Sequence, residues 1–460
     1  MENSKAIKLI DERDDVDFTN DFEVVKFDLL NRTNIEENSN KFYIIEFHIA
    51  HSHSKFKFRV FTHYGRVGDQ GVKDARHFNN EYDANSEYNR IFRQKTGSSK
   101  GRSYKKVEVA KLDVGSFKVK EKTKIAKVEV TNTNIKTQAN IDIHVSEFIQ
   151  RIYRESSAAL KYFIDVEIKD NVISTPLGVV SQKQIDDAKS ILMKIRDIHC
   201  TRDILCPTLY INEYYSKIPH KLSRNIRILS LLNTVEQVDE ELEVLRIMQD
   251  IFDVKNNIND NNPNDNIVNA DIKILNDNQE YDRLCKYFEH TKGHNHHHLK
   301  NSKIKRIFTS KLNSDFIRFN PNSLQVKELW HGSRNAHILG IVSKGLLINP
   351  SGIIKTGEML GKGLYFADCS TKSLQYAATQ FTGYSRSVSD CFMFLVEVAV
   401  GNILKVTSVS KIPDTLPSNY HSLMGEKGNT KTYYNTLEHN EYVIRNVNQA
   451  KISYILHIQL

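Results

Sequence analysis

The spacing of hydrophobic residues changes along this chain, and each spacing predicts a different kind of structure. In the first part, apolar residues form short runs such as 42–49 and 55–61, and the second run alternates basic and apolar residues. Such alternation is typical of a half-buried strand with one charged face. A glycine-punctuated turn at 64–71 and a helical stretch at 84–95 follow. The pattern predicts a small β-rich domain with one helix over residues 20–125.

In the second part, apolar residues recur at spacings of three and four, which is the period of an amphipathic helix. Three such faces are Val145, Phe148, Ile149 and Ile152; Ile185, Ala188, Leu192 and Ile195; and Val235, Val238, Leu242, Leu245 and Phe252. Ser181 and Gln184 form a capping-box pattern, which predicts the start of the second helix. We expect an all-α helical bundle over residues 140–255, joined to the first domain by a linker at 126–139, within the stretch 112–139 where lysine alternates with small polar residues.

The third part, residues 256–460, begins with an Asn/Asp-rich tract at 256–266 that is too polar to pack. A helical stretch at 280–288 follows. The continuous apolar run 392–400 predicts a buried central strand, and 451–459 predicts a closing strand. We therefore expect a mixed, mainly antiparallel β domain here, and a multidomain α+β protein as a whole.

Composition limits the class of protein. A chain of 460 residues is too long for one hydrophobic core, so several domains are expected. Residues 1–19 are acidic and polar, which predicts a disordered tail and no secretory signal. No run reaches the roughly 18 apolar residues that span a bilayer, so no membrane partner is expected. The five cysteines form no C-x-x-C pair, which argues against zinc fingers and disulfides and favours a reducing intracellular compartment.

Positive charge is concentrated in the first predicted domain. The formal net charge is +8, and residues 20–125 alone contain 21 Lys and Arg against 14 Asp and Glu. From residue 90 to residue 124 the count is 12 against 3. A basic stripe of this kind is typical of a domain that binds a polyanion, with nucleic acid as the first candidate. On charge alone, a solvated face or a flexible basic linker is an equally good interpretation.

Two dense motifs set useful polar side chains beside glycines. They are Leu329-Trp330-His331-Gly332-Ser333-Arg334 and Gly361-Lys362-Gly363-Leu364-Tyr365-Phe366-Ala367-Asp368. Glycines let a ligand or another backbone approach closely, so this pattern favours a small-molecule site. The tract His294-Asn295-His296-His297-His298 suggests a metal instead. A polar loop supplies neither rigid geometry nor supporting hydrogen bonds, so we expect no metal.

The motifs of the third part occur in the order of a known family. Trp330 to Arg334, Gly361 to Asp368, Ser373, Tyr376 and Asn440-Glu441-Tyr442 closely resemble the ADP-ribosyltransferase domain of poly(ADP-ribose) polymerases. The resemblance covers the whole segment from about residue 312 to the end. It implies NAD+ as the substrate and no metal.

The other two parts resemble accessory domains of the same family. Tyr64 to Gly71, the helix that follows and Lys95-Thr96-Gly97 resemble a WGR domain, in which Tyr64 replaces the tryptophan and Arg66 is retained. The segments Pro176-Leu177-Gly178 and Tyr215 to His220 resemble the family's helical regulatory domain. The layout is similar to that of the short, DNA-dependent members without zinc fingers, and it implies Tyr64 and Arg66 as DNA-binding residues.

The resemblance also implies a role for each site residue. The side chain of His331 would hold the adenine-side ribose, while the Gly332 backbone and the Ser373 hydroxyl would bind the nicotinamide carboxamide. The nicotinamide ring would lie between Tyr376 and Tyr365.

Further residues would complete the site. Ser333 and Arg334 would face the adenosine. Glu441 would bond the nicotinamide ribose, stabilise the developing cation and polarise the acceptor hydroxyl. Met359 and Lys372 match positions near the acceptor.

The combination of His331, Tyr365 and Glu441 marks the polymer-forming branch of that family. The resemblance therefore implies a poly(ADP-ribosyl)transferase that is activated by broken or nicked DNA and modifies itself and other proteins in the nucleus. Two other functions remain open: a mono-ADP-ribosyltransferase, and a DNA- or NAD-binding protein that has lost turnover.

Overall fold

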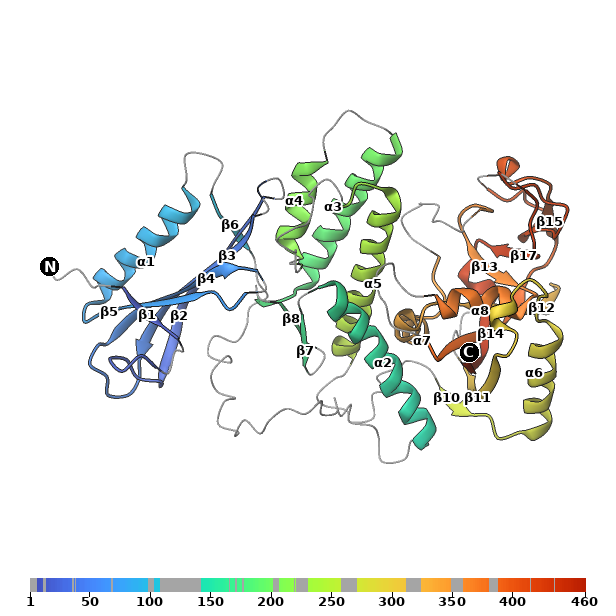
Figure 1. Ribbon diagram of the computed structural model, residues 1–460, viewed down its shortest axis with the longest axis horizontal. Helices are drawn as coiled ribbons and strands as arrows, with labels where there is room; N and C mark the ends of the chain where they lie inside the picture. Colours follow the sequence, from blue (N-terminus) through green and yellow to red (C-terminus); the bar gives the residue numbers. More distant parts are fainter. Residues whose placement is uncertain are drawn as a thin grey trace. The chain divides into compact units, whose positions relative to one another are not determined.

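The structure is a computed structural model, shown as a ribbon in Figure 1. It describes residues 6–10, 14–34, 37, 39–67, 69–97, 103–107, 142–164, 166–169, 172–175, 178–201, 207–218, 220, 231–257, 271–311, 324–348, 359–379, 388–413, 415–433 and 435–460. The predicted linker at 126–139, the Pro176-Leu177 step and most of the tract at 256–266 lie outside the described residues. The chain divides into two compact units, Met1–Thr133 with Lys161–Gln249 and Asn134–Leu160 with Asp250–Leu460.

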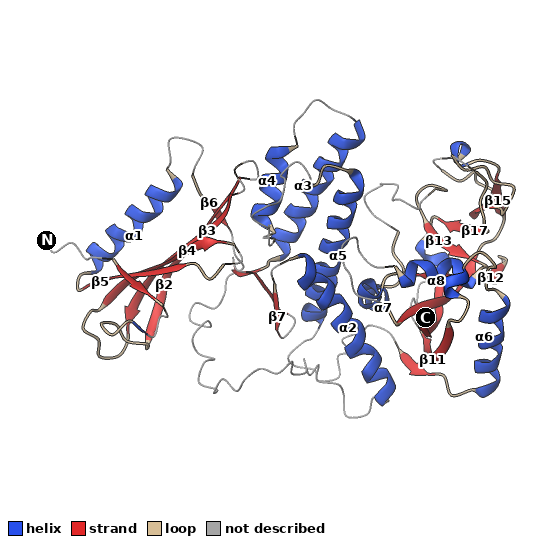
Figure 2. Ribbon diagram, in the orientation of Figure 1, coloured by secondary structure: helices blue, strands red, loops and turns tan. Residues whose placement is uncertain are grey.

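A six-stranded antiparallel sheet forms the β-rich part of the first unit, in the order β1-β5-β4-β3-β2-β6. Its strands are β1 (Ile7–Leu9), β2 (Phe22–Asn34), β3 (Ser39–Ala50), β4 (Phe58–Arg66), β5 (Val72–Phe78) and β6 (Lys105–Val107). Helix α1 (Glu81–Thr96) covers one face of the sheet with Ala84, Tyr88 and Ile91 (Figure 2). The prediction of a β-rich domain with one helix is confirmed.

The prediction of a disordered tail at residues 1–19 is wrong for the part that the structure describes. Strand β1 adds to the edge of the sheet beside β5. Asp15 is buried, and its carboxylate accepts hydrogen bonds from Arg59 and His77, each at 2.8 Å. Burial alone would raise the pKa of Asp15, but these partners outweigh it and the pKa is lowered. Asp15 is therefore a buried partner of Arg59, and hydropathy cannot distinguish such a residue from a solvated one.

Four helices follow, in the region predicted to be a helical bundle. They are α2 (Ile143–Phe163), α3 (Gln182–Thr201), α4 (Thr208–Lys217) and α5 (Val235–Asn257). The three predicted apolar faces lie on α2, α3 and α5, so these helices are confirmed. Within the first unit, α3 and α5 are joined by a buried ion pair between Arg196 and Asp239 at 2.6 Å.

The prediction that this region is all-α needs one correction. A small antiparallel sheet, β7 (Glu167–Lys169), β8 (Val172–Thr175) and β9 (Gly178–Val179), lies between α2 and α3 along the chain. Its strands are only two to four residues long and fall between longer helical patterns, so periodicity over a helical window does not detect them.

Side-chain caps explain where three helices begin. The Asn80 side chain accepts a hydrogen bond from the backbone of α1, and Asp277 does the same for α6 (Asn278–His290). At the start of α3, the Gln184 backbone N–H donates to the Ser181 hydroxyl, and the Gln184 side chain accepts from the Ser181 backbone N–H. The predicted capping box is therefore confirmed. Each cap satisfies an N–H group that has no partner within its own helix.

A nine-stranded, mainly antiparallel sheet is the framework of the second unit, in the order β10-β11-β18-β14-β12-β13-β17-β16-β15. Its strands are β10 (Ile272–Ile274), β11 (Lys303–Ser310), β12 (Val326–Gly332), β13 (Leu364–Ala367), β14 (Asp390–Ala399), β15 (Ile403–Val406), β16 (Ser422–Gly425), β17 (Glu441–Ile444) and β18 (Ala450–Gln459). Only the pair β15 and β16 is parallel among the strands that the structure describes. The predicted central strand β14 and closing strand β18 pair with each other.

Helices cover both faces of this sheet. On one face, α6 and α8 (Ser370–Ala378) pack their apolar side chains against Trp330, Met393 and Leu395. On the other face, Phe148 of α2 packs between Phe308 and Phe392, with ring centroids 4.9 Å from each. The described part of the unit also contains α7 (Ile338–Lys344) and the 3-10 turns η3 (His297–Leu299), η6 (Asn335–His337), η7 (Val409–Lys411) and η8 (Val447–Gln449).

Candidate active site

The end of β12 and the start of α8 approach each other more closely than any side chain would allow. A Cβ atom placed on Gly332 would lie 1.8 Å from the carbonyl oxygen of Ser373. Only glycine fits at this point. The Ser373 hydroxyl is buried and donates a hydrogen bond to the Trp330 carbonyl at 3.0 Å, so its oxygen can still accept one. The structure thus brings together the two residues predicted to hold a carboxamide.

Three neighbouring strands align the residues of the two motifs. Trp330 of β12 pairs with Ala367 of β13, and Ala367 pairs with Glu441 of β17. Residues opposite each other in a sheet have their side chains on the same face. Glu441, which follows Ala367 by more than seventy positions, is therefore placed beside the first two motifs by strand register. The sheet explains how a site can be assembled from three distant segments.

Glu441 is buried and paired with a cation. Its Oε1 atom lies 3.0 Å from Nζ of Lys372 on α8, and its side chain is only 6% exposed. Burial alone would lower the pKa of Lys372, but the charge of Glu441 and the contact with Tyr376 outweigh it, and the pKa is raised. A buried carboxylate needs such a partner because an unpaired charge is costly away from water.

His331 and Tyr365 are joined through the backbone. Nδ1 of His331 donates to the carbonyl oxygen of Tyr365 at 2.9 Å, which fixes the orientation of the ring. The hydroxyl of Tyr365 in turn donates to the carbonyl oxygen of Gly361 at 2.5 Å and accepts from the backbone N–H of Leu360 at 2.9 Å. Tyr365 therefore holds the glycine turn in place. Its side chain packs against a buried apolar cluster made of Leu360, Val406, Val409, Leu423 and Val443.

The other predicted site residues lie around this centre. Tyr376 is 45% exposed, with the Lys372 ammonium 5.5 Å from its ring centroid, so its ring can receive a stacking partner. Ser333 and Arg334 follow Gly332 directly and are half-buried. Met359 lies at the start of the described part of the turn and packs partly against Leu360. No ligand contact tests these roles, and they stay predictions.

Sequence reasoning missed residues that support the site. The side chain of Asp368 accepts hydrogen bonds from Asn440 at 2.8 Å and from the Tyr442 hydroxyl at 3.3 Å, on either side of Glu441. The indole N–H of Trp330 donates to Thr291 of the segment after α6. Asp368 is the last residue of the second motif and Tyr442 follows the glutamate. The only indication in the sequence was that Asp368 and Tyr442 both belong to the motifs of the site.

Two histidines lie near the site; the sequence singled out only His296, as part of the histidine tract, and not His439. His296 and His439 are both buried, and their rings stack at a centroid separation of 4.7 Å. Burial and the positive charges of His296 and Lys372 lower the pKa of His439 to about 4. The pKa of His296 is lowered as well, chiefly by burial. The lowered pKa favours the neutral form of both rings.

The predicted DNA-binding residues lie in the first unit. The ring of Tyr64 stacks on Tyr43 at 5.0 Å and its hydroxyl donates to Asp74 at 3.1 Å, so the side chain is part of its own domain's packing. Arg66 ends β4, opposite Lys41 of β3, and is half-buried. Part of the basic stripe is balanced within the domain, because Arg90 pairs with Glu87 and Lys106 with Asp28. Most of the stripe beyond residue 97 lies outside the described residues.

Within the described segments, no helix is both long and apolar enough to span a membrane.

Comparison with known proteins covers the chain in three consecutive segments. Residues 27–106 match the WGR domain, residues 139–273 match the poly(ADP-ribose) polymerase regulatory domain, and residues 278–460 match the poly(ADP-ribose) polymerase catalytic domain.

Relatives match across nearly the whole chain. The poly [ADP-ribose] polymerase of Sarcophaga peregrina is 27% identical over 93% of this chain and 45% of its own length. Poly [ADP-ribose] polymerase 2 of Arabidopsis thaliana is 26% identical over 94% of this chain and 72% of its own length. The human poly [ADP-ribose] polymerase 2 is 25% identical over 94% and 79%. The chain thus spans less than half of the insect relative and most of the shorter ones. With its WGR, regulatory and ADP-ribosyltransferase catalytic domains, the chain belongs to the poly(ADP-ribose) polymerase family.

Proposed function

We propose that this chain is an NAD-dependent poly(ADP-ribosyl)transferase that is activated by DNA breaks. The observation that carries the proposal is the position of Glu441: strand register sets it beside Ala367, and Lys372 holds its carboxylate at 3.0 Å. The contact between Gly332 and Ser373, where the nicotinamide carboxamide would bind, lies on the adjacent strand β12 and helix α8.

Cleavage of the bond between nicotinamide and ribose needs few catalytic groups. Nicotinamide leaves NAD+ when the bond between the ribose carbon and the ring nitrogen breaks, and the bonding electron pair neutralises the pyridinium. The ribose then resembles an oxocarbenium ion, as in glycoside hydrolysis, and a nearby carboxylate stabilises it. Because the leaving group is already good, a strong general acid is unnecessary.

Glu441 would act on both partners of the transfer. Its carboxylate would bond the ribose and stabilise the developing cation. It would also accept a hydrogen bond from the attacking hydroxyl, whose oxygen forms the new bond to the ribose carbon as its proton passes to the carboxylate or to solvent. On an acceptor protein this gives the first ADP-ribose unit, and on a bound ADP-ribose hydroxyl it lengthens the chain. Lys372 would orient the carboxylate for both steps.

The remaining residues would bind and orient NAD+. Ser373 has a hydroxyl oxygen that can accept from the carboxamide N–H, since its own hydrogen is donated to Trp330. Tyr376 offers an exposed ring for stacking, and the ring of Tyr365 is fixed by the two hydrogen bonds of its hydroxyl. Aromatic rings on either side of a flat cationic ring are a favourable arrangement. The fixed orientation of His331 suits a hydrogen bond to the other ribose.

Acceptor proteins, including the chain itself, and broken or nicked DNA are the proposed partners, and the nucleus is the proposed location. The presence of a WGR domain supports the DNA partner, and the human and plant relatives named poly [ADP-ribose] polymerase 2 support polymer formation.

The experiment incubates the purified chain with labelled NAD+, with and without nicked DNA, and compares Glu441→Gln with Glu438→Gln. Glu438 is exposed and three residues away, so it is a matched control for the substitution itself. We expect DNA-stimulated ladders from the wild type and from the control, and no ladder from Glu441→Gln.

Each other outcome identifies an alternative. Single modifications by the wild type would support a mono-ADP-ribosyltransferase and contradict polymer formation. No label and no released nicotinamide would support a binding protein. Equal labelling without DNA would contradict activation by DNA breaks.

A further inference from the structure

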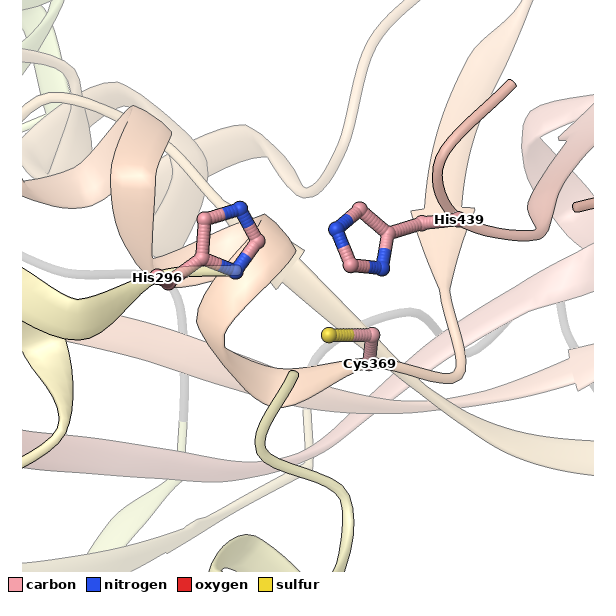
Figure 3. Close-up of side chains that lie close together, drawn as sticks. All are labelled: His296, Cys369 and His439. Atoms are coloured by element: carbon pink, nitrogen blue, oxygen red, sulfur yellow. The ribbon is translucent and has the colours of Figure 1, made fainter. Parts of the chain in front are cut away.

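Three side chains with metal-binding atoms meet in the catalytic domain beside the proposed active site. They are His296, Cys369 and His439, and one ligand atom from each lies within 4.8 Å of the other two. Figure 3 shows the two imidazole rings next to each other. The side chain of Cys369 lies below them in this view. The side chains come from three segments that are about seventy residues apart. No local spacing in the sequence brings them together, so folding alone creates the cluster.

The cluster is enclosed by protein. His296, Cys369 and His439 are 7%, 8% and 7% exposed. A Cβ atom on Gly293 would lie 2.9 Å from the Cys369 sulfur and 2.9 Å from a ring carbon of His439. The backbone of Gly293 therefore forms one wall of the cluster at a distance that excludes a side chain. Such a site holds its ligands in place, which an exposed histidine tract does not.

One buried ring nitrogen of His439 is available to bind an ion. Nε2 of His439 is buried and has no hydrogen-bond partner among the residues that the structure describes. A buried polar atom without a partner is rare in native proteins and needs an explanation. A bound cation supplies that partner, because a neutral imidazole nitrogen is a good metal ligand.

Neighbouring side chains are suited to support metal ligands. Nε2 of His296 contacts the side-chain amide of Gln375 on α8. If that amide presents its oxygen, the Nε2 hydrogen is donated to it and Nδ1 faces the cluster. The hydroxyl of Thr371 lies 3.4 Å from the Cys369 sulfur and 2.9 Å from Nδ1 of His296, and it accepts from the Gly293 N–H. Its one hydrogen is donated either to Nδ1 of His296 or to the sulfur, so once Nδ1 binds an ion this hydrogen is available to stabilise a thiolate.

We propose that His296, Cys369 and His439 bind a single zinc ion. Two nitrogens and one sulfur are the ligands of a borderline-soft cation, whereas calcium and magnesium take oxygen. Zinc–nitrogen and zinc–sulfur bonds of about 2.0–2.3 Å place tetrahedral ligand atoms about 3.3–3.8 Å apart. The three ligand atoms lie within 4.8 Å of one another, so movements of about 1 Å would bring them to these distances. Three protein ligands leave the fourth position to a water or another small ligand.

The ion would fix the surroundings of the proposed catalytic pair. Cys369 precedes Lys372 by three residues, and His439 precedes Glu441 by two. A bond from one metal to both would tie the start of α8 to the start of β17. In this role the ion would link two segments of the chain, and its test does not depend on NAD+ or on transfer activity.

The experiment measures metal directly on the full chain, prepared without a histidine tag. Elemental analysis of protein grown with zinc, copper, nickel and iron in the medium should give one zinc per chain. After removal of the metal by a chelator, one equivalent of cobalt(II) should produce the visible bands of a tetrahedral site and a thiolate-to-cobalt charge-transfer band. Zinc should then displace the cobalt and raise the melting temperature.

The variants decide where the ion sits. Cys369→Ser should abolish the charge-transfer band, and His439→Asn should lower zinc affinity at least tenfold. The matched control is His297→Asn with His298→Asn, two exposed residues of the same tract, and it should keep one zinc. Because a variant can misfold, thiol counting on the native wild type provides a second measurement. The zinc-bound chain should have one reactive thiol fewer than the metal-free chain.

Three results would overturn the proposal. Zinc binding that survives Cys369→Ser unchanged would place the ion elsewhere. Zinc lost only in the control would mean adventitious binding by the exposed tract. A metal-free chain that neither binds zinc nor changes in thiol reactivity would leave the cluster as a stacked pair of neutral histidines beside a buried thiol.

Discussion

Lys372 forms an ion pair with Glu441 at the start of an inner strand of the catalytic sheet, with Nζ of the lysine 3.0 Å from Oε1 of the glutamate. The lysine lies on α8, which also carries Ser373 and Tyr376, and the glutamate begins β17. This one contact therefore connects the part of the site proposed for nicotinamide with the residue proposed for chain elongation.

The substitution Lys372→Met should reduce transfer because the Glu441 carboxylate loses its orienting partner. A hydrogen bond to a charged group is worth about 1.5–3 kcal/mol, which corresponds to a fall of about 10- to 150-fold in kcat/KM. Single-turnover and steady-state assays with labelled NAD+ measure it. The control is Lys411→Met, an exposed lysine of the same domain, which should match the wild type. Equal activity of the two variants would show that Lys372 does not orient the carboxylate.

The substitution Gly332→Ala should disrupt the junction of β12 and α8. The new methyl group would meet the Ser373 carbonyl oxygen at 1.8 Å, so one of the two elements must move. Overpacking of this kind costs about 1–3 kcal/mol, which lowers the melting temperature by several degrees. Binding of a nicotinamide analogue, measured by calorimetry, should weaken at least tenfold. Unchanged binding and stability would mean that the junction is more adaptable than its packing indicates.

An ion pair between α2 and the catalytic sheet makes stability depend on pH. The guanidinium of Arg151 donates to both carboxylate oxygens of Asp390 at 2.6 and 2.7 Å, and His457 and Lys305 also face this carboxylate. The hydrogen bonds from Arg151 are the largest cause of a strongly lowered pKa of Asp390. A carboxyl whose pKa is lower in the folded state contributes stability above its unfolded value of about 3.9, and this is lost as the pH falls through the folded value.

The variant Asp390→Asn should therefore be less stable than the wild type by about 1–3 kcal/mol at pH 5 to 7. The difference should shrink below about pH 4, where the wild-type carboxyl begins to lose its advantage. Urea unfolding at several pH values, followed by the fluorescence of the single tryptophan, Trp330, measures both. Asp282→Asn, on the exposed face of α6, should stay close to the wild type throughout. A difference that does not change with pH would exclude the charge of Asp390 as its cause.

Much of the fold followed from periodicity, because its long elements bury one regular face. Helices α2, α3 and α5 and strands β14 and β18 have apolar residues at the spacing of their element, and their packing partners do not change that signal. The short strands β7, β8 and β9 have no such signal, since two to four residues cannot show a period. The segment containing Asp15 was misjudged because this one carboxylate is buried as a partner of Arg59.

The site was predictable to the extent that its motifs are continuous in sequence. Gly332 and Ser373 were recognised from their motifs, and the structure adds that they touch. The cluster of His296, Cys369 and His439 could not be found in this way, because its members share no spacing and meet only when β13, β17 and the segment after α6 are in place. Sequence reasoning dismissed the histidine tract for lack of rigidity, yet His296 is buried while His297 and His298 are exposed.

The N-terminal segment should be necessary for the stability of the WGR domain. Arg59 is 1% exposed, and Asp15 is a charged partner for it at 2.8 Å. Removing one member of a buried pair leaves an unpaired charge and costs about 3–5 kcal/mol. Asp15→Ala should therefore speed hydrogen exchange of the β4 backbone in the full chain by about 10²-fold or more. Asp17→Ala, which removes only the exposed pair with Lys55, should have little effect, and equal exchange in both variants would contradict the prediction.

Arg66 and Tyr64 should differ in their effect on DNA binding, although they are two residues apart. The tyrosine ring is stacked on Tyr43 and its hydroxyl is bonded to Asp74, so Tyr64→Phe removes a hydrogen bond inside the domain. It should lower stability by about 1 kcal/mol and leave DNA affinity unchanged. Arg66→Ala removes a positive charge at the end of β4 and should weaken binding to nicked DNA at every salt concentration.

The dependence of DNA binding on salt separates a phosphate contact from a change in folding. Each phosphate that a protein neutralises contributes about −0.9 to the slope of log affinity against log salt, because counterions are released. Fluorescence anisotropy with a labelled nicked duplex should therefore give a slope smaller by about one for Arg66→Ala and the wild-type slope for Tyr64→Phe. If Arg66→Ala lowers affinity at an unchanged slope, the arginine supports the turn. If neither variant changes binding, the basic stripe of residues 90–124 carries the contact with DNA, because its 12 Lys and Arg outnumber its 3 acidic residues.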